Sequence, residues 1–129
     1  MDYFLTISHN NLKNIQNFLK DIEINTEQIL NEYELFSNYP NPFNPTTKIK
    51  YNLPYNSKVE ITIYDIMGRE VKSFSDISKT SGSHELEWNG TNNYGEKVSS
   101  GIYLMKFIAN SIEGNNKIYS KTLKLNQLK

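Results

Sequence analysis

Residues 59–71 read VEITIYDIMGREV and contain two runs of strand-forming residues around a tight turn. Apolar side chains occupy every second position from Val59 to Ile63, with Glu60 and Thr62 between them. Successive side chains of a strand point to opposite faces, so this alternation indicates a half-buried strand. Residues 65–68 (DIMG) are typical of a type I turn that ends in a left-handed glycine. The stretch therefore predicts a hairpin whose second strand covers residues 70–74.

Four other stretches show the same alternation between turn-forming residues, namely residues 48–53, 84–88, 101–109 and 117–125. The stretch 101–109 is apolar on both faces, which predicts an interior strand. Trp88 is the single tryptophan, and we expect it to pack at the centre of the core. Six to seven short strands with no helix between them predict a mainly β fold, an antiparallel β-sandwich.

The region before the strands has a different period. In residues 9–33 apolar side chains fall at helical spacing, which predicts a short helical segment. Residues 37–46 (SNYPNPFNPT) contain three of the four prolines, so they cannot be helical and are expected to lead into the first strand in an extended conformation. We therefore divide the chain into residues 1–34, a helical N-terminal segment or the remnant of an upstream cargo domain, and residues 35–129, the β domain.

Composition excludes several functions. Lys and Arg together number 14, as do Asp and Glu, so there is no net charge to favour nucleic acid. Cysteine is absent, which excludes disulfides and thiolate chemistry. No apolar run reaches the roughly 20 residues that a membrane-spanning helix needs. The first residues, MDYFLTISHNN, do not read as a signal peptide.

Candidate catalytic and metal-binding residues are few. The two histidines, His9 and His84, are far apart in sequence and no serine nucleophile motif accompanies them. Glu85 and Glu87 share a strand face, which is better explained as the solvated side of a sandwich strand than as a carboxylate pair. The oxygen-rich loop 89–96 lacks the spacing of a calcium loop. We expect a non-catalytic domain with no cofactor and no metal.

Several blocks, taken in order, resemble the type A C-terminal sorting domain of the bacterial type IX secretion (Por) system. The blocks are YPNPFNPT (39–46), VEITIYDIMGREV (59–71), WNGTN (88–92), SGIY (100–103) and KTLKL (121–125). That family is similar in fold to the Ig-like domain of flagellar hook-cap proteins. The resemblance implies an Ig-like sandwich over residues 35–129.

The resemblance also implies a function. The folded domain would be a secretion signal that the outer-membrane translocation machinery recognises, carrying cargo from the periplasm to the cell surface or the medium. A cell-surface, sortase-like peptidase would remove the domain in a flexible stretch near residues 31–38. A signal of this kind is expected to be monomeric and to sit at the end of a longer protein. The alternative is a free-standing, non-catalytic assembly or binding module similar to the hook-cap domain.

The family motif assigns positions whose residue types indicate structural roles in turns and core. These positions are Pro40, Asn41, Pro42, Phe43, Asn44, Pro45, Tyr64, Asp65, Gly68, Trp88, Gly90, Gly95, Gly101 and Tyr103. Three residues of the last predicted strand, Lys121, Lys124 and Leu125, are candidate recognition residues, because the C-terminal end of the family is implicated in export. The lysines are explained equally well as a solvated face or as edge residues that prevent strand pairing.

Overall fold

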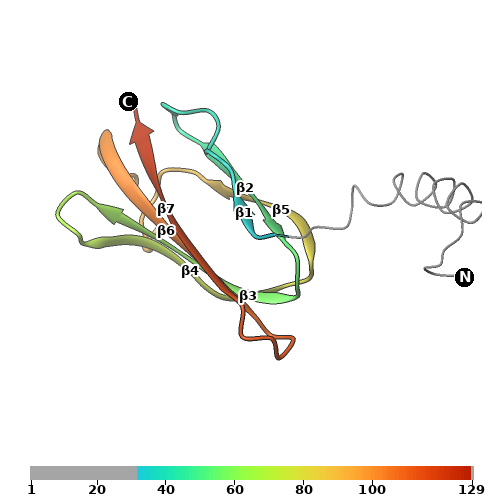
Figure 1. The fold of residues 1–129 in the computed structure, drawn as a ribbon. Coiled ribbons are helices and arrows are strands. Elements are labelled where there is room, and N and C mark those ends of the chain that lie inside the picture. The colour runs from blue at the N-terminus through green and yellow to red at the C-terminus, as the bar shows by residue number, and fades with distance from the viewer. Residues whose placement is uncertain (1–31, 129) are drawn as a thin grey trace, which may run out of the picture. The chain divides into compact units, whose positions relative to one another are not determined.

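The computed structural model describes residues 32–128, and these form seven β-strands in two antiparallel sheets (Figure 1). The helical segment predicted over residues 9–33 lies outside the described residues, apart from its last two positions, which are not helical. His9 also lies outside them. Between residues 32 and 128 there is no helix, and therefore none that could cross a membrane.

One sheet has the order β1-β2-β5, and the other has the order β4-β3-β6-β7. The three-stranded sheet consists of β1 (Glu34–Leu35), β2 (Thr47–Leu53) and β5 (Gly82–Trp88). The four-stranded sheet consists of β3 (Ser57–Asp65), β4 (Glu70–Lys79), β6 (Gly101–Ser111) and β7 (Ile118–Gln127). The predicted mainly β, antiparallel sandwich is thus confirmed, and each of the six predicted strands corresponds to an observed one.

The alternation of residues 59–63 produces the expected packing. Val59, Ile61 and Ile63 are fully buried and pair in register with three buried residues of β6, namely Ala109, Phe107 and Met105. Strand β6 lies between β3 and β7, as its two apolar faces predict. The predicted turn between β3 and β4 is also present, because the Gly68 N–H donates to the Asp65 carbonyl (3.0 Å) and Gly68 has a φ of 83°.

Strand β1 was not predicted, and it corrects the expectation of a flexible stretch near residues 31–38. Glu34 and Leu35 pair with Asn52 and Tyr51, and Leu35 is buried. Just before β1, the ring of Tyr33 stacks on the ring of Tyr119 with centroids 5.7 Å apart. Two paired residues are too few to show an alternation, so the pattern gave no signal for this strand.

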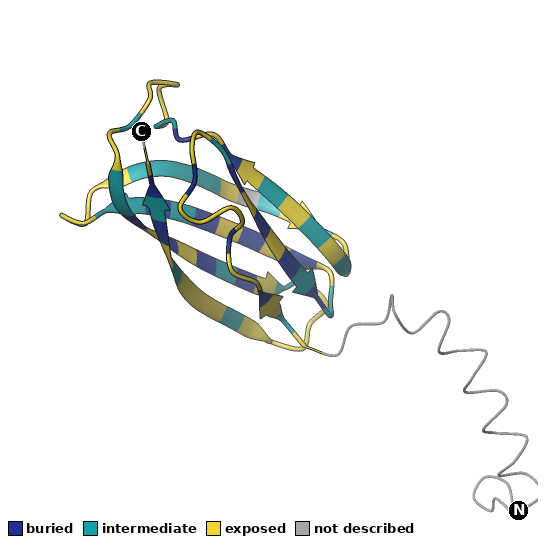
Figure 2. Cartoon of the chain, turned by 90° about the horizontal axis from the view of Figure 1, so that it is seen from above, coloured by how far each residue is buried: buried dark blue, intermediate teal, exposed yellow. Residues whose placement is uncertain are grey.

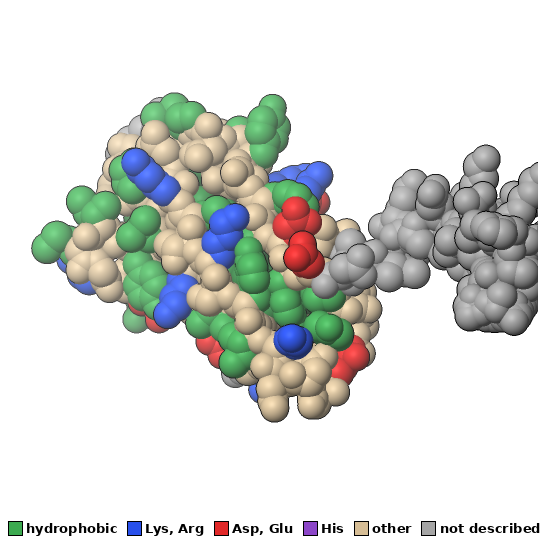
Figure 3. Space-filling model, viewed as in Figure 1, with side chains coloured by type: hydrophobic (Ala, Val, Ile, Leu, Met, Phe, Trp, Pro, Cys, Tyr) green, Lys and Arg blue, Asp and Glu red, His purple; other side chains and the backbone are tan. Residues whose placement is uncertain are grey.

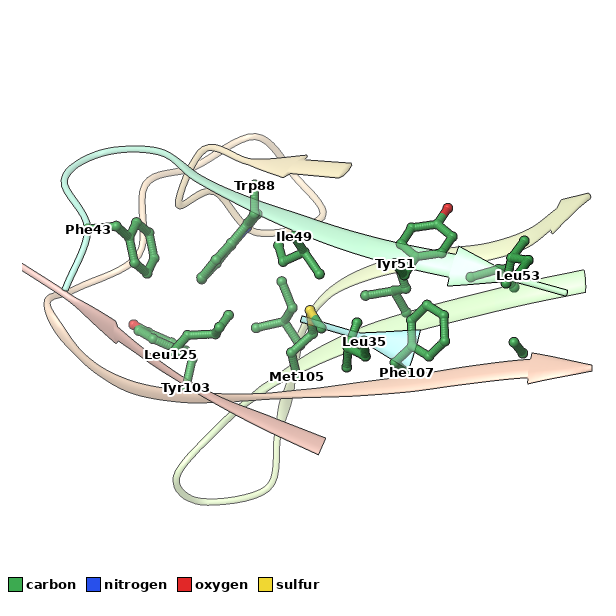
Figure 4. Close-up of a cluster of buried hydrophobic side chains, with 14 residues drawn as sticks. Leu35, Phe43, Ile49, Tyr51, Leu53, Trp88, Tyr103, Met105, Phe107 and Leu125 are labelled. Atoms are coloured by element: carbon green, nitrogen blue, oxygen red, sulfur yellow. The ribbon is translucent and has the colours of Figure 1, made fainter. Parts of the chain in front are cut away.

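The core lies between the two sheets (Figures 2 and 4). Its buried apolar residues are Leu35, Phe43, Ile49, Tyr51, Leu53, Val59, Ile61, Ile63, Trp88, Tyr103, Met105, Phe107, Ala109 and Leu125. Trp88 is the largest fully buried side chain, and its ring contacts Phe43 (centroids 5.4 Å apart) and Tyr103 (5.5 Å). One end of the core is therefore aromatic.

Truncation of Trp88 should be costly. We predict that Trp88→Ala lowers the free energy of unfolding by about 3–5 kcal/mol, because it removes a large buried ring and leaves a cavity. Urea unfolding of both proteins measures the difference. Tyr94→Ala is the control, since Tyr94 is 87% exposed and should change stability by no more than about 0.5 kcal/mol. A Trp88→Ala variant as stable as the control would contradict this core.

Candidate functional site

Parts of all five predicted motif blocks lie at one end of the sandwich, which we call the motif end. The motif end comprises the loops of residues 36–46, 65–70 and 89–100 together with residues 125–128. Strands β3, β5 and β7 end there, and β2, β4 and β6 begin there. Figure 1 shows the loop between β1 and β2 lying beside the C-terminus. Blocks that are far apart in sequence thus form one surface.

A short segment, residues 41–45, lies along the last residues of the chain, and we call it the strap. The Phe43 N–H donates to the Asn126 carbonyl (2.9 Å), and the Leu128 N–H donates to the Phe43 carbonyl (2.9 Å). These bonds form a parallel bridge between Phe43 and Gln127. The Asn126 N–H donates to the side-chain oxygen of Asn41 (3.1 Å). The strap therefore adds to the four-stranded sheet alongside the last residues of β7, on the edge away from β6.

Proline content explains why the pairing is concentrated on Phe43. Pro40, Pro42 and Pro45 have no N–H to donate, and their preceding peptide bonds are all cis. Phe43, which lies between two of these prolines, does have an N–H to donate, and its ring is buried. Asn44 is exposed. The strap is thus anchored by one backbone pairing and one aromatic ring.

Residues just before the strap are hydrogen-bonded to the first residue of β2. The Thr47 hydroxyl donates to the Pro40 carbonyl (2.8 Å) and accepts from the Asn38 side-chain amide (3.0 Å). Both Thr47 and Asn38 are buried, so these bonds satisfy polar groups that water cannot reach.

Gly90 packs where three segments meet. Its φ is 73°, and a Cβ at this position would lie 2.8 Å from Gln127 Nε2 and 3.1 Å from the Pro45 carbonyl oxygen. By contrast, Gly95 has a φ of 81°, but a Cβ added there would have no neighbouring atom within 4 Å. Gly90 is therefore required both for its conformation and for its small size, because the strap and the end of β7 press against it.

Hydrogen bonds within the loop 89–100 hold the loop against Trp88 and Tyr103. The Trp88 indole N–H donates to the Thr91 carbonyl (2.9 Å), and the Tyr103 hydroxyl donates to the Ser99 carbonyl (2.5 Å). The side-chain oxygen of Asn92 accepts from the N–H groups of Tyr94 (2.9 Å) and Glu96 (3.0 Å). The Asn92 side-chain oxygen, one of the oxygens of the loop 89–96, is therefore already hydrogen-bonded to the backbone of its own loop.

A groove of about 860 Å³ lies at the motif end between the β3–β4 turn and residues 96–103. Beside it, Ile66 and Met67 project from the turn with 72% and 75% of their surface exposed. The sequence pattern predicts only a turn here. The missed signal was two apolar residues at the central turn positions, where polar residues and glycine are usual.

Asp65 organises the turn that carries Ile66 and Met67. One carboxylate oxygen accepts from the N–H groups of Met67 (2.9 Å) and Arg69 (3.0 Å), and the other accepts from Arg69 Nε (2.8 Å). The Arg69 backbone N–H is the largest cause that lowers the pKa of Asp65 below its ordinary value, and the Arg69 side chain and the Met67 N–H add to it.

The three candidate recognition residues do not form one surface. Leu125 is fully buried, which corrects its assignment, because its side chain cannot contact a partner while the domain is folded. Lys121 and Lys124 are exposed but lie on opposite faces of β7, since side chains alternate along a strand. Lys121 Nζ donates to the Leu35 carbonyl across the gap between the two sheets (3.3 Å).

The remaining motif positions lie in the sheet and its turns. Tyr64 is half-buried on the outer face of β3, in register with Leu104 of β6. Gly101 begins β6 with a φ of 147°.

The described residues considered for catalysis lie on opposite faces of β5, with His84 on one face and Glu85 and Glu87 on the other. His84 stacks on the Tyr51 ring (centroids 5.5 Å apart), and its Nε2 lies 2.7 Å from the Thr80 carbonyl oxygen. Glu85 and Glu87 are exposed and lie in register with Lys50 and Lys48. Within residues 32–128, no three His, Cys, Asp or Glu side chains gather as metal ligands would.

Substitution of Gly90 tests whether the strap and the end of β7 pack against this residue. We predict that Gly90→Ala lowers the free energy of unfolding by about 2–4 kcal/mol, from left-handed strain and from overpacking against Gln127. Gly95→Ala is the matched control and should cost only the strain, about 1–2 kcal/mol. Thermal or urea unfolding measures both. Equal losses for the two variants would mean that the strap and β7 do not pack on Gly90.

Acid unfolding tests the role of Asp65. Because folding lowers the pKa of Asp65, its contribution to stability is present above the unfolded value of about 4 and is lost as the pH falls through the folded value. We predict that Asp65→Asn flattens the loss of stability in this acidic range. Arg69→Met, which keeps the backbone N–H at position 69, should retain most of the pH dependence. Unfolding curves at successive pH values provide the test, and identical slopes for wild type and Asp65→Asn would contradict it.

Comparison with known proteins places this geometry in a family. The family model of the FlgD Ig-like domain matches residues 43–111, from the strap to the end of β6. No curated protein sequence matches the chain.

Solved structures with the same fold include PorU of Porphyromonas gingivalis in its dimeric latent form (22% identity, TM-score 0.56), where the similarity covers 77% of this chain but only 10% of PorU. They also include FlgD of Pseudomonas aeruginosa (22% identity, TM-score 0.53, 75% of each chain). FlgD of Xanthomonas campestris is similar over 74% of this chain and 71% of its own (17% identity, TM-score 0.53). At these identities the likeness concerns the fold alone. The family match, in contrast, covers more than half of the chain, so the chain belongs to the FlgD Ig-like domain family.

Proposed function

We propose that residues 32–129 act as a C-terminal secretion signal of the type IX system, which the outer-membrane translocation machinery recognises as a folded unit. The signal would direct attached cargo through the periplasm to the cell surface or the medium. The resemblance of the five sequence blocks to the sorting-domain family motivates this proposal. Membership in the FlgD Ig-like family and the fold shared with part of PorU are compatible with it.

One observation supports the proposal above the others, namely the pairing of the strap with the end of β7. The first motif block and the last residues of the chain are joined by the bonds from Phe43 to Asn126 and from Leu128 to Phe43. A linear C-terminal tag would need no such pairing. A signal that has to be folded before it is read would display both blocks on one surface, as the motif end does.

The motif end also offers features that a partner can contact. Ile66 and Met67 expose apolar surface on a turn held rigid by Asp65, and the groove lies directly beside them. Exposed apolar residues on a rigid turn lose little entropy on binding, which favours their use as contacts. We propose that the translocation machinery contacts the turn that carries Ile66 and Met67, which we call the tip. We further propose that the domain is monomeric and non-catalytic.

Removal of the domain by a cell-surface, sortase-like peptidase would have to occur before Tyr33. Strand β1 and the buried Asn38 make residues 34–38 part of the folded sandwich, where a peptidase could not bind an extended backbone. We therefore place the proposed cleavage upstream of the stacked Tyr33.

An assembly module is the second candidate. The chain shares its fold with FlgD of Xanthomonas campestris, a protein whose structure has been described in terms of hook capping in flagellar assembly. In that reading the same exposed tip would hold a neighbouring protein, and no export would depend on it.

An export assay separates the two readings. A fluorescent protein targeted to the periplasm would carry residues 32–129 at its C-terminus in a bacterium with an active type IX system. We predict delivery to the surface or the medium, loss of delivery when residues 125–129 are removed, and loss when Met67→Glu places a charge on the tip. The matched control is Ile112→Glu, at another exposed apolar position at the opposite end of the sandwich.

The outcomes differ sharply. Fluorescence that stays in the periplasm for the unaltered fusion, although the domain is folded, would overturn the secretion proposal in favour of the assembly module. Delivery that Met67→Glu and Ile112→Glu reduce equally would contradict the assignment of the tip as the contact. Circular dichroism of the purified variants establishes that each one is folded.

A further inference from the structure

Strand β7 leaves one long edge of the four-stranded sheet open. Its ten residues pair with β6 in an unbroken register from Ile118 to Gln127. On its other side, the pairing within residues 32–128 is confined to the strap, at Asn126 to Leu128. The rest of that side, residues 118–124, has no neighbouring strand among the described residues.

The strap reveals which backbone groups face outward. It bonds to the carbonyl and N–H of Asn126 and to the N–H of Leu128, so the even-numbered residues of β7 direct these groups away from β6. In an antiparallel pair, every second residue points its N–H and carbonyl away from the partner strand. Ser120, Thr122 and Lys124 therefore present donors and acceptors along the open edge, in line with those that the strap already uses.

The other edges of the sandwich are less suited to an added strand. Strand β1 has two residues, and the pairing of β4 with β3 contains two irregularities of register. Strand β5 is shorter than β7 and exposes Glu85 and Glu87. Short strands, bulges and charges are the usual protections of a sheet edge. Strand β7 is long and regular, and its edge is unprotected apart from its lysines.

Side chains beside this edge define what it would accept. On the inner face, Tyr119 and Leu123 are half-buried at the rim of the core, and the charge of Lys121 between them is directed to the Leu35 carbonyl (3.3 Å). On the outer face, Lys124 and Lys106 are exposed on neighbouring strands. Figure 3 shows Lys or Arg side chains lying between hydrophobic ones on the side of the molecule seen in Figure 1. Strand β7 itself contains two lysines and no acidic residue.

A second copy of the chain does not fit this pattern. Antiparallel pairing of two β7 edges would place two lysines on each face of the joined strands with no acidic residue on either strand, and like charges on paired strands repel. A strand with acidic residues toward the outer face and apolar residues toward Tyr119 and Leu123 would be complementary on both faces.

We propose that residues 118–124 of β7 bind an extended peptide segment in which apolar and acidic residues alternate, and that this segment adds to the sheet as a fifth strand. Main-chain hydrogen bonds to Ser120, Thr122 and Lys124 would hold the segment, and side-chain alternation would select it. This site is separate from the tip of the motif end, so it goes beyond the secretion signal proposed above.

Amide hydrogen exchange of the full 129-residue chain tests the proposal. The probe is a capped synthetic heptapeptide in which valine and glutamate alternate, and the control peptide carries lysine in place of glutamate. At a peptide concentration about ten times its Kd, exchange of the Ser120, Thr122 and Lys124 amides should slow about tenfold. The amides of Tyr119 and Leu123, which face β6, should not change.

Two variants make the result specific to the edge. Thr122→Pro removes an outward N–H without removing a bond to β6 and should abolish peptide binding, whereas Thr122→Val keeps the N–H and should bind normally. Exchange protection of the β6 amides shows that both variants are folded. The double variant Lys106→Glu with Lys124→Glu should reverse the preference to the lysine peptide.

Four results would overturn the proposal. They are the absence of binding by the valine–glutamate peptide at millimolar concentration, protection at β4 or β5 instead of β7, equal binding by folded Thr122→Pro and Thr122→Val, and concentration-dependent dimerisation through β7. None of these results bears on the export assay, so the proposal for the β7 edge and the proposal for the secretion signal are tested independently.

Discussion

The structure depends on Phe43, whose ring and backbone hold different parts of the domain together. The ring packs against Trp88, which in turn contacts Tyr103 at the start of β6. The backbone of the same residue pairs with Asn126 and Leu128 at the end of the chain. Because three prolines leave few donors in this loop, these bonds cannot shift easily to a neighbour. Packing and pairing at one residue thus join the first and last motif blocks.

This constraint accounts for the arrangement of the motif end. Gly90 has to be small because the strap and Gln127 lie against it, and Asp65 has to bond three N–H groups to support an exposed apolar turn. The resulting surface is rigid and partly apolar. The open edge of β7 begins where the strap ends, so a partner strand there would extend a pairing that the chain itself has started.

Sequence reasoning predicted most of the sandwich because burial of one face imposes a local alternation on each strand that is long enough to show it. It placed Trp88 in the core and the turn at Gly68, but it missed β1, whose two residues are too short for a pattern. Which face of β7 is buried also depends on tertiary packing. Leu125 points into the core, while Lys121 reaches the carbonyl of Leu35 in the other sheet. No local signal in the sequence could reveal the strap, because its partner lies about 80 residues away in the chain.

The most direct test of this account is native-state hydrogen exchange at the Phe43 and Leu128 amides of the full chain. If the strap and the end of β7 form one unit, both amides are protected and open with the same free energy, which Phe43→Ala lowers at both positions. If Phe43 exchanges like an unfolded residue while the β6 amides remain protected, the strap is not part of the folded domain. The two motif blocks would then not be read as a single surface.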